Sequence, residues 1–257
     1  VPNTNKLKTH ERTDKVIACM ASFPARKEKM LATINSIVGQ VDQIYLYLNN
    51  YESIPDELAK YDNIEVVLGI NSAGDLRDNG KIYPFNHYDI KGYCFLMDDD
   101  IIYPVSYFNE FIKKIDLYHR QAVVGVHGVI FAKPFENYFE NRTIFHFKNE
   151  NVSDVVVNQL GTGALGFHTD TLIPNLTNYL ATGMADVFFA IEAKRHKIPL
   201  ICIAHPAEWI KPLDIEIEDN SNLYDEFKHN HSLQTKYIKE AGVFTESSII
   251  SILAKHQ

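Results

Sequence analysis

Short apolar runs along the first half of the chain predict strands, and the first of these runs suits a strand that is buried on both faces. The runs are VIACM (16–20), IYLYL (44–48), IEVVL (64–68) and YCFLM (93–97). Helices are predicted over 27–41, where Met30, Ile34 and Ile37 recur at helical spacing, and again after Pro104. Strands that alternate with helices predict an α/β fold with a parallel, doubly wound, Rossmann-like sheet that has helices on both faces.

The second half of the chain is patterned less regularly. AVVGVHGVIFA (122–132) resumes extended structure, and TIFHF (143–147), DVVV (154–157) and LICIA (200–204) predict further strands. A helix is predicted near 186–196. Residues 220–257 are predicted to be largely helical, and a short apolar patch there is expected to pack on the domain rather than on a membrane. The patch consists of Ile249, Ile250, Ile252 and Leu253.

Composition and charge narrow the class of protein. The 257 residues carry 25 Lys and Arg against 33 Asp and Glu, a formal net charge of −8, which argues against a nucleic-acid partner. Cys19, Cys94 and Cys202 lie inside apolar stretches, which favours a reducing compartment. No apolar run reaches the roughly 18 residues of a membrane span, and the first residues lack the apolar core of a leader. We expect a soluble segment of a longer polypeptide in the cytoplasm, or one peripheral at the inner face of the cell membrane.

Three aspartates at the end of the fourth predicted strand are the main candidate for chemistry. Asp98, Asp99 and Asp100 run straight into two isoleucines, which places like charges where water is partly excluded. Such a cluster is unfavourable unless a cation compensates it, and carboxylate oxygens suit Mg²⁺ or Mn²⁺ that also binds substrate phosphates. Ligands of open α/β sheets bind at this end of the strands. A solvated acidic turn is the alternative.

The segment GTGALG matches a dinucleotide-binding fingerprint, with Gly161, Gly163 and Gly166 at the required spacing. Such a motif should open a helix. The sequence continues instead with β-branched residues and Pro174, which a helix interior does not tolerate. We therefore favour a loop whose glycines let the backbone approach a ligand or a neighbouring strand.

Other charged residues are ambiguous when each is taken alone. Asp186 precedes an apolar helix, so it is either an N-cap or an acid that points into the cleft. Arg26 and Lys81 follow predicted strands and could meet a pyrophosphate, although a solvated surface charge is the simpler interpretation of either one.

Several motifs together resemble a known family, the bacterial capsule N-acetylglucosaminyltransferases that build heparosan. Their order and approximate spacing match from about residue 16 to Trp209, and DDDIIYP and VVNQLGTG are the most specific of them. The others are SFPAR, LNNYESIP, DNGK and GVHG, with Asp186 and Trp209 further on. Around CIAHPAEW the chain departs from the family, because His205 stands where the family has a basic residue.

The resemblance implies a GT-A glycosyltransferase fold, a UDP-sugar donor and Mn²⁺ or Mg²⁺ as the cofactor. It implies transfer of N-acetylglucosamine from UDP-GlcNAc to a terminal glucuronic acid of a growing capsular polysaccharide, forming an α-1,4 bond with retention. A glucuronyltransferase, as a partner or a fused domain, is also implied.

The resemblance also implies roles for individual residues. For the donor these are Ser22, Pro24, Arg26, Asn49, Asp78, Lys81, Asp98 and Asp99, and for the metal Asp100 with Asp98. Sugar transfer and acceptor binding are implied for His127, Asn158, Gln159, Gly161, Thr162, Gly163, Asp186 and Trp209, with Asp186, Asn158 and Gln159 as the catalytic candidates. Asp186 would orient or stabilise the sugars rather than act as the base of an inverting displacement.

We expect a polar arm at 1–14 and one GT-A domain at 15–257. The domain would hold a nucleotide-sugar half (15–130), an acceptor half (131–215) and a helical tail (216–257). Three alternatives stay open. A sugar-nucleotide nucleotidyltransferase would need a Gly-rich basic loop after the first strand, where SFPAR has no glycine. A carbohydrate- or cation-binding module without catalysis and, more distantly, a dehydrogenase are the other two.

Overall fold

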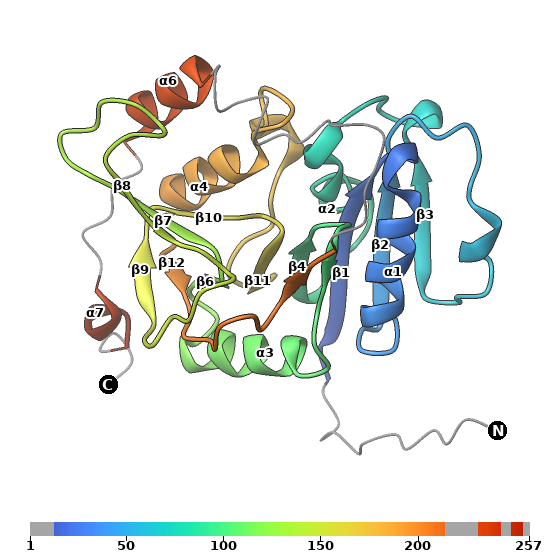
Figure 1. Cartoon of the computed structure of the whole chain (residues 1–257), viewed down its shortest axis with the longest axis horizontal. Helices are drawn as coiled ribbons and strands as arrows, with labels where there is room; N and C mark the ends of the chain where they lie inside the picture. Colours follow the sequence, from blue (N-terminus) through green and yellow to red (C-terminus); the bar gives the residue numbers. More distant parts are fainter. Residues whose placement is uncertain (1–12, 214–230, 243–247, 254–257) are drawn as a thin grey trace.

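A computed structural model describes residues 13–213, 231–242 and 248–253. Its centre is an eight-stranded sheet with the strand order β3-β2-β1-β4-β11-β6-β12-β9 (Figure 1). The strands are β1 (Lys15–Ser22), β2 (Gln43–Leu48), β3 (Ile64–Leu68), β4 (Gly92–Met97), β6 (Val123–Gly125), β9 (Val155–Val157), β11 (Ala164–His168) and β12 (Leu200–Cys202). Strands from both expected halves of the chain therefore share one sheet.

The sheet is mixed: β1 to β4, β6 and β12 share one direction, as predicted, whereas β11 and β9 run the opposite way. β11 is antiparallel to both β4 and β6, and β9 is antiparallel to β12. The apolar pattern of a strand carries no information about its direction, so the sequence did not reveal these two reversals. Because β11 is antiparallel, its first residue, Ala164, pairs with Met97 at the end of β4. The glycine loop before β11 thus lies beside the three aspartates.

Helices cover both faces of the sheet, as the sequence predicts. Helices α1 (Lys27–Ile37) and α3 (Tyr107–Leu117) pack on one face, and α4 (Ala185–Arg195) and α6 (Ser232–Ala241) lie on the other side (Figure 1). Successive residues of β1 alternate between the two cores: Ala18 packs with the first pair of helices, and Cys19 packs with the second. The sheet is thereby a rigid support for the loops at its strand ends.

Smaller elements complete the fold. β10 (Gln159–Leu160), β7 (Gly128–Phe131) and β8 (Arg142–Phe145) form a three-stranded sheet, and β5 (Ile101–Ile102) pairs with β13 (Lys211–Pro212). Short helices are η1 (Pro24–Arg26), η2 (Asp56–Leu58), η3 (Gly69–Asn71), η4 (Arg77–Lys81), α2 (Pro84–His87), η5 (Leu176–Asn178) and α7 (Ile249–Leu253). The extended segment expected at 122–132 is split at Val126 and His127, where the chain leaves the large sheet for the small one.

Other expectations meet the structure as follows. The three cysteines are buried and free. In the C-terminal patch Ile252 is buried and its neighbours Ile249 and Leu253 pack against the core, whereas Ile250 is exposed. Among the described residues, no helix is long and apolar enough to cross a membrane. Most of the expected arm, together with 214–230, 243–247 and 254–257 of the expected tail, lies outside the described residues.

Candidate active site

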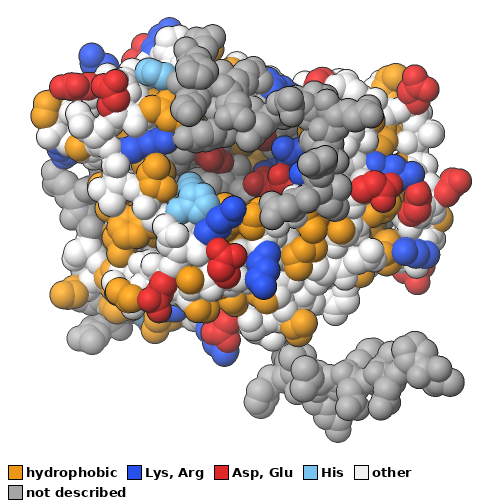
Figure 2. All heavy atoms as spheres, viewed as in Figure 1, with side chains coloured by type: hydrophobic (Ala, Val, Ile, Leu, Met, Phe, Trp, Pro, Cys, Tyr) orange, Lys and Arg blue, Asp and Glu red, His pale blue; other side chains and the backbone are white. Residues whose placement is uncertain are grey.

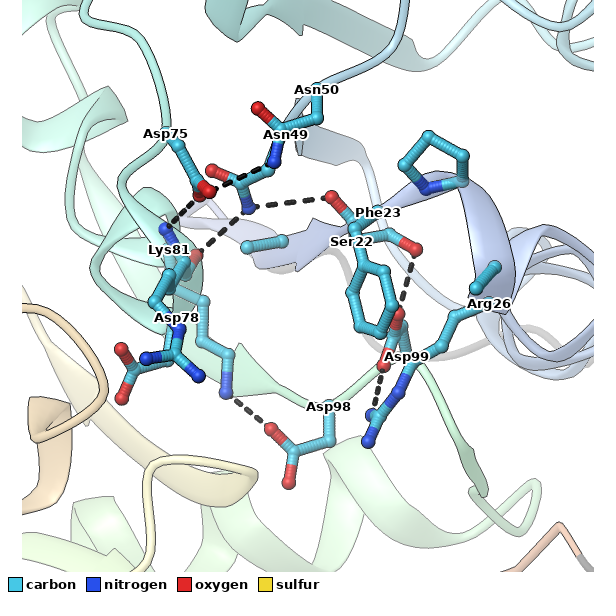
Figure 3. Close-up of a pocket in the computed structure, with 14 residues that line it drawn as sticks. Ser22, Phe23, Arg26, Asn49, Asn50, Asp75, Asp78, Lys81, Asp98 and Asp99 are labelled. Carbon is cyan, nitrogen blue, oxygen red and sulfur yellow. Dashed lines mark hydrogen bonds and ion pairs between the residues drawn. The ribbon is translucent and has the colours of Figure 1, made fainter. Parts of the chain in front are cut away.

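A cavity of about 660 Å³ opens at the carboxyl ends of β1, β2 and β4. Each of these strands ends in polar residues, and the polar loop 75–81 closes the far side (Figure 3). Every residue that the sequence predicts for the donor lines this cavity, namely Ser22, Pro24, Arg26, Asn49, Asp78, Lys81, Asp98 and Asp99. Asn49 is buried, and its amide holds the loop by donating to the carbonyl of Arg77 and accepting from the N–H of Leu76.

The acidic triplet is compensated by the protein's own cations. Arg26 Nη1 donates to Asp99 Oδ1 at 2.8 Å and to Asp100 Oδ2 at 3.0 Å. Lys81, which is buried, forms an ion pair with Asp98 from the opposite side (Figure 3). Two cations against three carboxylates leave a formal charge of −1. Two side chains from elsewhere in the sequence thus supply part of the compensation that the sequence analysis assigned to a bound cation, and the metal stays a prediction.

The pKa values of the triplet differ because the aspartates differ in burial and partners. Burial raises the pKa of Asp99 in spite of its bonds to Arg26 and Ser22. Burial and then the neighbouring charge of Asp98 raise the pKa of Asp100 to about 6. Burial also opposes ionisation of Asp98, but the contact with Lys81 outweighs it and lowers the pKa of Asp98. Ionisation of Asp99 and of Asp100 is therefore disfavoured, and ionisation of Asp98 is favoured.

The donor atoms of the triplet fit a hard divalent cation. Asp98 Oδ2 and Asp100 Oδ1 accept no hydrogen bond from the described residues, so one oxygen of each remains open. No group of three or more metal-ligating side chains occurs within the described ranges. A site of this kind supplies one or two carboxylates, and Mg²⁺ commonly binds in that way together with substrate phosphates.

A second cavity of about 620 Å³ adjoins the first, since Asp78, Lys81 and Asp98 line both. Of the residues predicted for sugar transfer and the acceptor, His127, Gln159, Gly161, Thr162, Gly163 and Asp186 line it. The sequence analysis missed Tyr138, Phe139, Arg142, His146 and Phe147 on the same wall. Their signal was the aromatic run FENYFENRTIFHF, which carries a single arginine.

The glycine loop places its backbone against the acidic triplet. Gly163 O accepts a hydrogen bond from the Asp98 N–H at 3.2 Å. A β-carbon on Gly163 would overlap the carboxylate of Asp98, so glycine here lets the loop backbone and that carboxylate lie in contact. The segment then enters strand β11 instead of a helix. The dinucleotide-fingerprint hypothesis is therefore wrong, and the close-approach interpretation of the glycines is confirmed.

Asp186 does not cap its helix. Helix α4 begins at Ala185 after Met184, and the side chain of Asp186 turns to Thr162, whose N–H and Oγ1 donate to Asp186 Oδ1 at 2.7 and 2.6 Å. Burial raises the pKa of Asp186, and the bonds from Thr162 act against that rise. The N–H of Ala185, the first residue of the helix, is satisfied by Asp78, which also accepts from the N–H of Gly183 just before the helix. The N-cap hypothesis for Asp186 is thus wrong.

Two polar side chains of the second cavity keep unused hydrogen-bonding groups. Burial, reinforced by His146 and Arg142, lowers the pKa of His127 to about 4, so its ring is neutral at pH 7. His127 Nδ1 and Gln159 Oε1 are buried and have no hydrogen-bond partner among the described residues. Gln159 Nε2 donates to the hydroxyl of Tyr138 at 2.6 Å. Such open groups are where a polar ligand can bind.

Three of the predicted residues line neither cavity. Asn158 is buried, and its Oδ1 accepts from the N–H of Phe131, which fixes β7. Trp209 stacks on Phe111 of α3. Asp100 lies beside the first cavity, where it meets Arg26. Neither Asn158 nor Trp209 is brought together with the other candidates.

Comparison with solved structures supports the fold assignment. The S. aureus TarS 1–349 structure is similar to this chain with a TM-score of 0.54 and 10% sequence identity, covering 94% of this chain and 70% of that one. S. aureus TarS 1–349 in complex with UDP-GlcNAc gives a TM-score of 0.55 at 10% identity, with 94% and 71% covered. No family model and no curated protein matches the sequence. The chain has the mixed α/β fold of GT-A nucleotide-sugar transferases.

Proposed function

We propose that the protein is a glycosyltransferase that moves N-acetylglucosamine from UDP-GlcNAc to the terminal glucuronic acid of a growing capsular polysaccharide. The observation that carries this proposal is the pair of adjoining cavities, one at the strand ends of a GT-A fold and one beside it, which share Asp78, Lys81 and Asp98. A donor in the first and an acceptor in the second would meet at those residues. The UDP-GlcNAc complex of the TarS structure and the motif resemblance support the choice of donor.

In this proposal the first cavity binds the nucleotide. Asn49 and the adjacent loop give backbone and amide groups for the uridine, while Arg26 and Lys81 supply positive charge for the diphosphate. Asp98 and Asp100 would hold Mn²⁺ or Mg²⁺, which would neutralise charge that develops on the leaving UDP. Asp98 and Gly163 lie in contact where the two cavities join, and the donor sugar would bind over them.

The transfer step balances without a further reactant. The bond between the anomeric carbon and the β-phosphate oxygen breaks, and its electron pair leaves with UDP. The acceptor hydroxyl oxygen bonds to that carbon, and its proton goes to the released phosphate. Asp186, held through Oδ1 by Thr162, keeps its second oxygen to orient hydroxyls or to stabilise positive charge on the sugar ring. An α-linked donor that gives an α-linked product corresponds to retention.

The proposal is tested with purified protein, UDP-GlcNAc and a glucuronate-terminated oligosaccharide, with MnCl₂ or with EDTA. Release of UDP together with a product heavier by one N-acetylhexosamine is expected with Mn²⁺ and is lost in EDTA. A panel of nucleotide sugars in a thermal-shift assay checks the donor. Formation of a sugar nucleotide from a sugar phosphate and UTP would instead support the nucleotidyltransferase alternative, and sugar binding without any turnover would support a binding module.

A further inference from the structure

Arg142 contributes an unusual cation to the second cavity. It is the first residue of β8, and its guanidinium carbon lies 4.4 Å from the ring centroid of Phe139 and 5.2 Å from that of Tyr138. Both rings line the same cavity. Contact with aromatic faces holds a guanidinium in place and leaves its N–H groups available at the edges.

No carboxylate in the described part of the chain forms an ion pair with Arg142. Its Nε is buried and has no hydrogen-bond partner there. A partly buried cation without an anionic partner costs free energy, which aromatic contacts offset only in part. Arg142 therefore has capacity for an anion that the described residues do not supply.

The other charges of the cavity are already engaged. Lys81 is paired with Asp98, Asp78 accepts from the start of α4, and Asp186 accepts from Thr162. His127 is neutral at pH 7, because burial and then His146 and Arg142 lower its pKa. The cavity thus presents one positive group, Arg142, that no described carboxylate pairs with; its side chain shares a hydrogen bond with Tyr138 and lies beside apolar rings suited to the face of a sugar. On the face seen in Figure 2, charged side chains gather around a central hollow, and histidine and hydrophobic side chains border it.

We infer that Arg142 binds an acidic group of the acceptor, a carboxylate or a phosphate, and so selects acidic acceptors over neutral ones. This inference rests on the proposed function. The planar fork of an arginine matches the two oxygens of either group, and such charge-assisted pairs are about twice as strong as neutral hydrogen bonds. The aromatic wall then packs against the ring of the sugar that carries the acid. Arg142 is a specificity-determining residue in this arrangement, and it does not line the donor cavity.

The test uses Arg142→Met, which keeps an unbranched chain against the rings, and Arg142→Lys, which keeps the charge and loses the fork. Lys113→Met, on an exposed side chain of α3, is the matched control for loss of one positive charge. Three acceptors are compared: a glucuronate-terminated oligosaccharide, its carboxyl-reduced neutral form, and a phosphate-bearing one. Circular dichroism and thermal melting show that each variant is folded.

We expect the wild-type protein to prefer an acidic acceptor. In Arg142→Met the KM for the acidic acceptor should rise by about tenfold or more, because a charge-assisted pair is lost. The KM for the neutral acceptor should rise less than that for the acidic one. Arg142→Lys should fall in between, and Lys113→Met should match wild type on every acceptor. The acid that shows the discrimination, carboxylate or phosphate, identifies the source. Equal losses on acidic and neutral acceptors would overturn the inference.

A binding measurement separates this inference from the proposed function. Calorimetric titration of the donor-free protein with the glucuronate and the phosphate oligosaccharides reports the anion subsite without any turnover. Binding that is lost in Arg142→Met but kept in Lys113→Met supports the subsite even when UDP-GlcNAc proves to be the wrong donor. Equal binding by wild type and Arg142→Met overturns the subsite even when transfer is observed.

Discussion

Asp78 caps helix α4 although the helix begins at Ala185, which lies 107 residues further along the chain. Its two carboxylate oxygens accept from different backbone groups, Oδ1 from Gly183 at 2.6 Å and Oδ2 from Ala185 at 2.8 Å. The same side chain lines both cavities. One carboxylate thus ties the loop 75–81 of the first cavity to the helix that carries Asp186.

Replacing Asp78 by alanine should destabilise the protein by about 1–3 kcal/mol. Two partly buried N–H groups lose their acceptor and a helix loses its cap, and each loss has a cost of this order. Asp78→Asn keeps one acceptor oxygen and should cost less. Urea unfolding of the two variants and of Asp89→Ala, a change on an exposed loop, measures the difference. A free energy of unfolding within 0.5 kcal/mol of wild type, on the order of a surface change, contradicts this role.

Local patterns predict the elements well and the long-range contacts poorly. The strand predicted at 64–68 is β3 with the same bounds, because a run of apolar and β-branched residues is a local feature of the sequence. The cap on α4 could not be predicted, since its acceptor is Asp78 and not the acid nearest the helix start. For the same reason the sequence analysis placed an isolated acidic cluster at 98–100, whereas Lys81 and Arg26 reach it through the fold.

The second cavity shows what a motif-based interpretation leaves out. The glycine loop and Asp186 were found because they form recognisable patterns. Arg142 and Tyr138 belong to a segment without a recognisable motif, and their side chains line the second cavity only because β8 pairs with β7. Asn158 is the converse case: its motif, VVNQLGTG, suggests chemistry, but its side chain serves the backbone of Phe131.

The raised pKa of Asp100 predicts a pH-dependent stability for the metal-free protein. A carboxyl with a pKa of about 6 when folded, against an ordinary 3.8, holds its proton more tightly in the folded state. The free energy of unfolding therefore falls as pH rises from about 4 to about 6, by about 1–3 kcal/mol. Asp100→Asn should remove this loss and melt at a higher temperature than wild type at pH 7.5 in EDTA.

Melting curves of wild type and Asp100→Asn between pH 4 and pH 8 check this, with Asp89→Asn, on an exposed side chain, as the control. The two proteins should converge towards pH 4, where Asp100 is protonated. A constant difference across the range would contradict the assignment. The same variant should lose transfer activity with Mn²⁺ if Asp100 is a metal ligand, and near-normal turnover would remove it from the metal site.

The ion pair between Lys81 and Asp98 predicts competition with a metal. Lys81 is buried and occupies one oxygen of a carboxylate that is a candidate ligand. A metal ion must share Asp98 with the ammonium group of Lys81, so Mn²⁺ alone should bind weakly. UDP should strengthen the binding of Mn²⁺, because its phosphate oxygens are additional ligands. Lys81→Met should bind free Mn²⁺ about tenfold more tightly, as expected when one like charge is removed at contact distance. Electron paramagnetic resonance of unbound Mn²⁺ gives the Kd, and Lys91→Met, an exposed change, is the control. An unchanged or higher Kd in Lys81→Met means that the ion pair does not compete.

The hydrogen bonds between Thr162 and Asp186 allow a structural role of Asp186 to be distinguished from a catalytic one. Thr162 uses both its N–H and its hydroxyl on one oxygen, Oδ1, so the carboxylate is oriented and its other oxygen stays open. Asp186→Asn keeps an acceptor for Thr162 and should retain its melting temperature. Turnover should fall by roughly a hundredfold or more, the scale for removing one preorganised charge near a developing cation.

Thr162→Val and Thr162→Ser test the orientation itself. Valine removes the hydrogen bond from the hydroxyl but keeps the one from the backbone N–H, so the carboxylate is less firmly oriented and kcat should drop. The affinity for UDP-GlcNAc, measured by calorimetry, should stay within twofold, a difference of less than about 0.5 kcal/mol. Serine keeps the hydroxyl and should restore most of kcat. A stable, fully active Asp186→Asn would show that the charge is not used, and Thr162 would then serve only to join the glycine loop to helix α4. A catalytic role for the carboxylate requires that Asp186→Asn lose turnover at an unchanged melting temperature and that Thr162→Val lose less. These two variants alter only the charge of the carboxylate and its orientation.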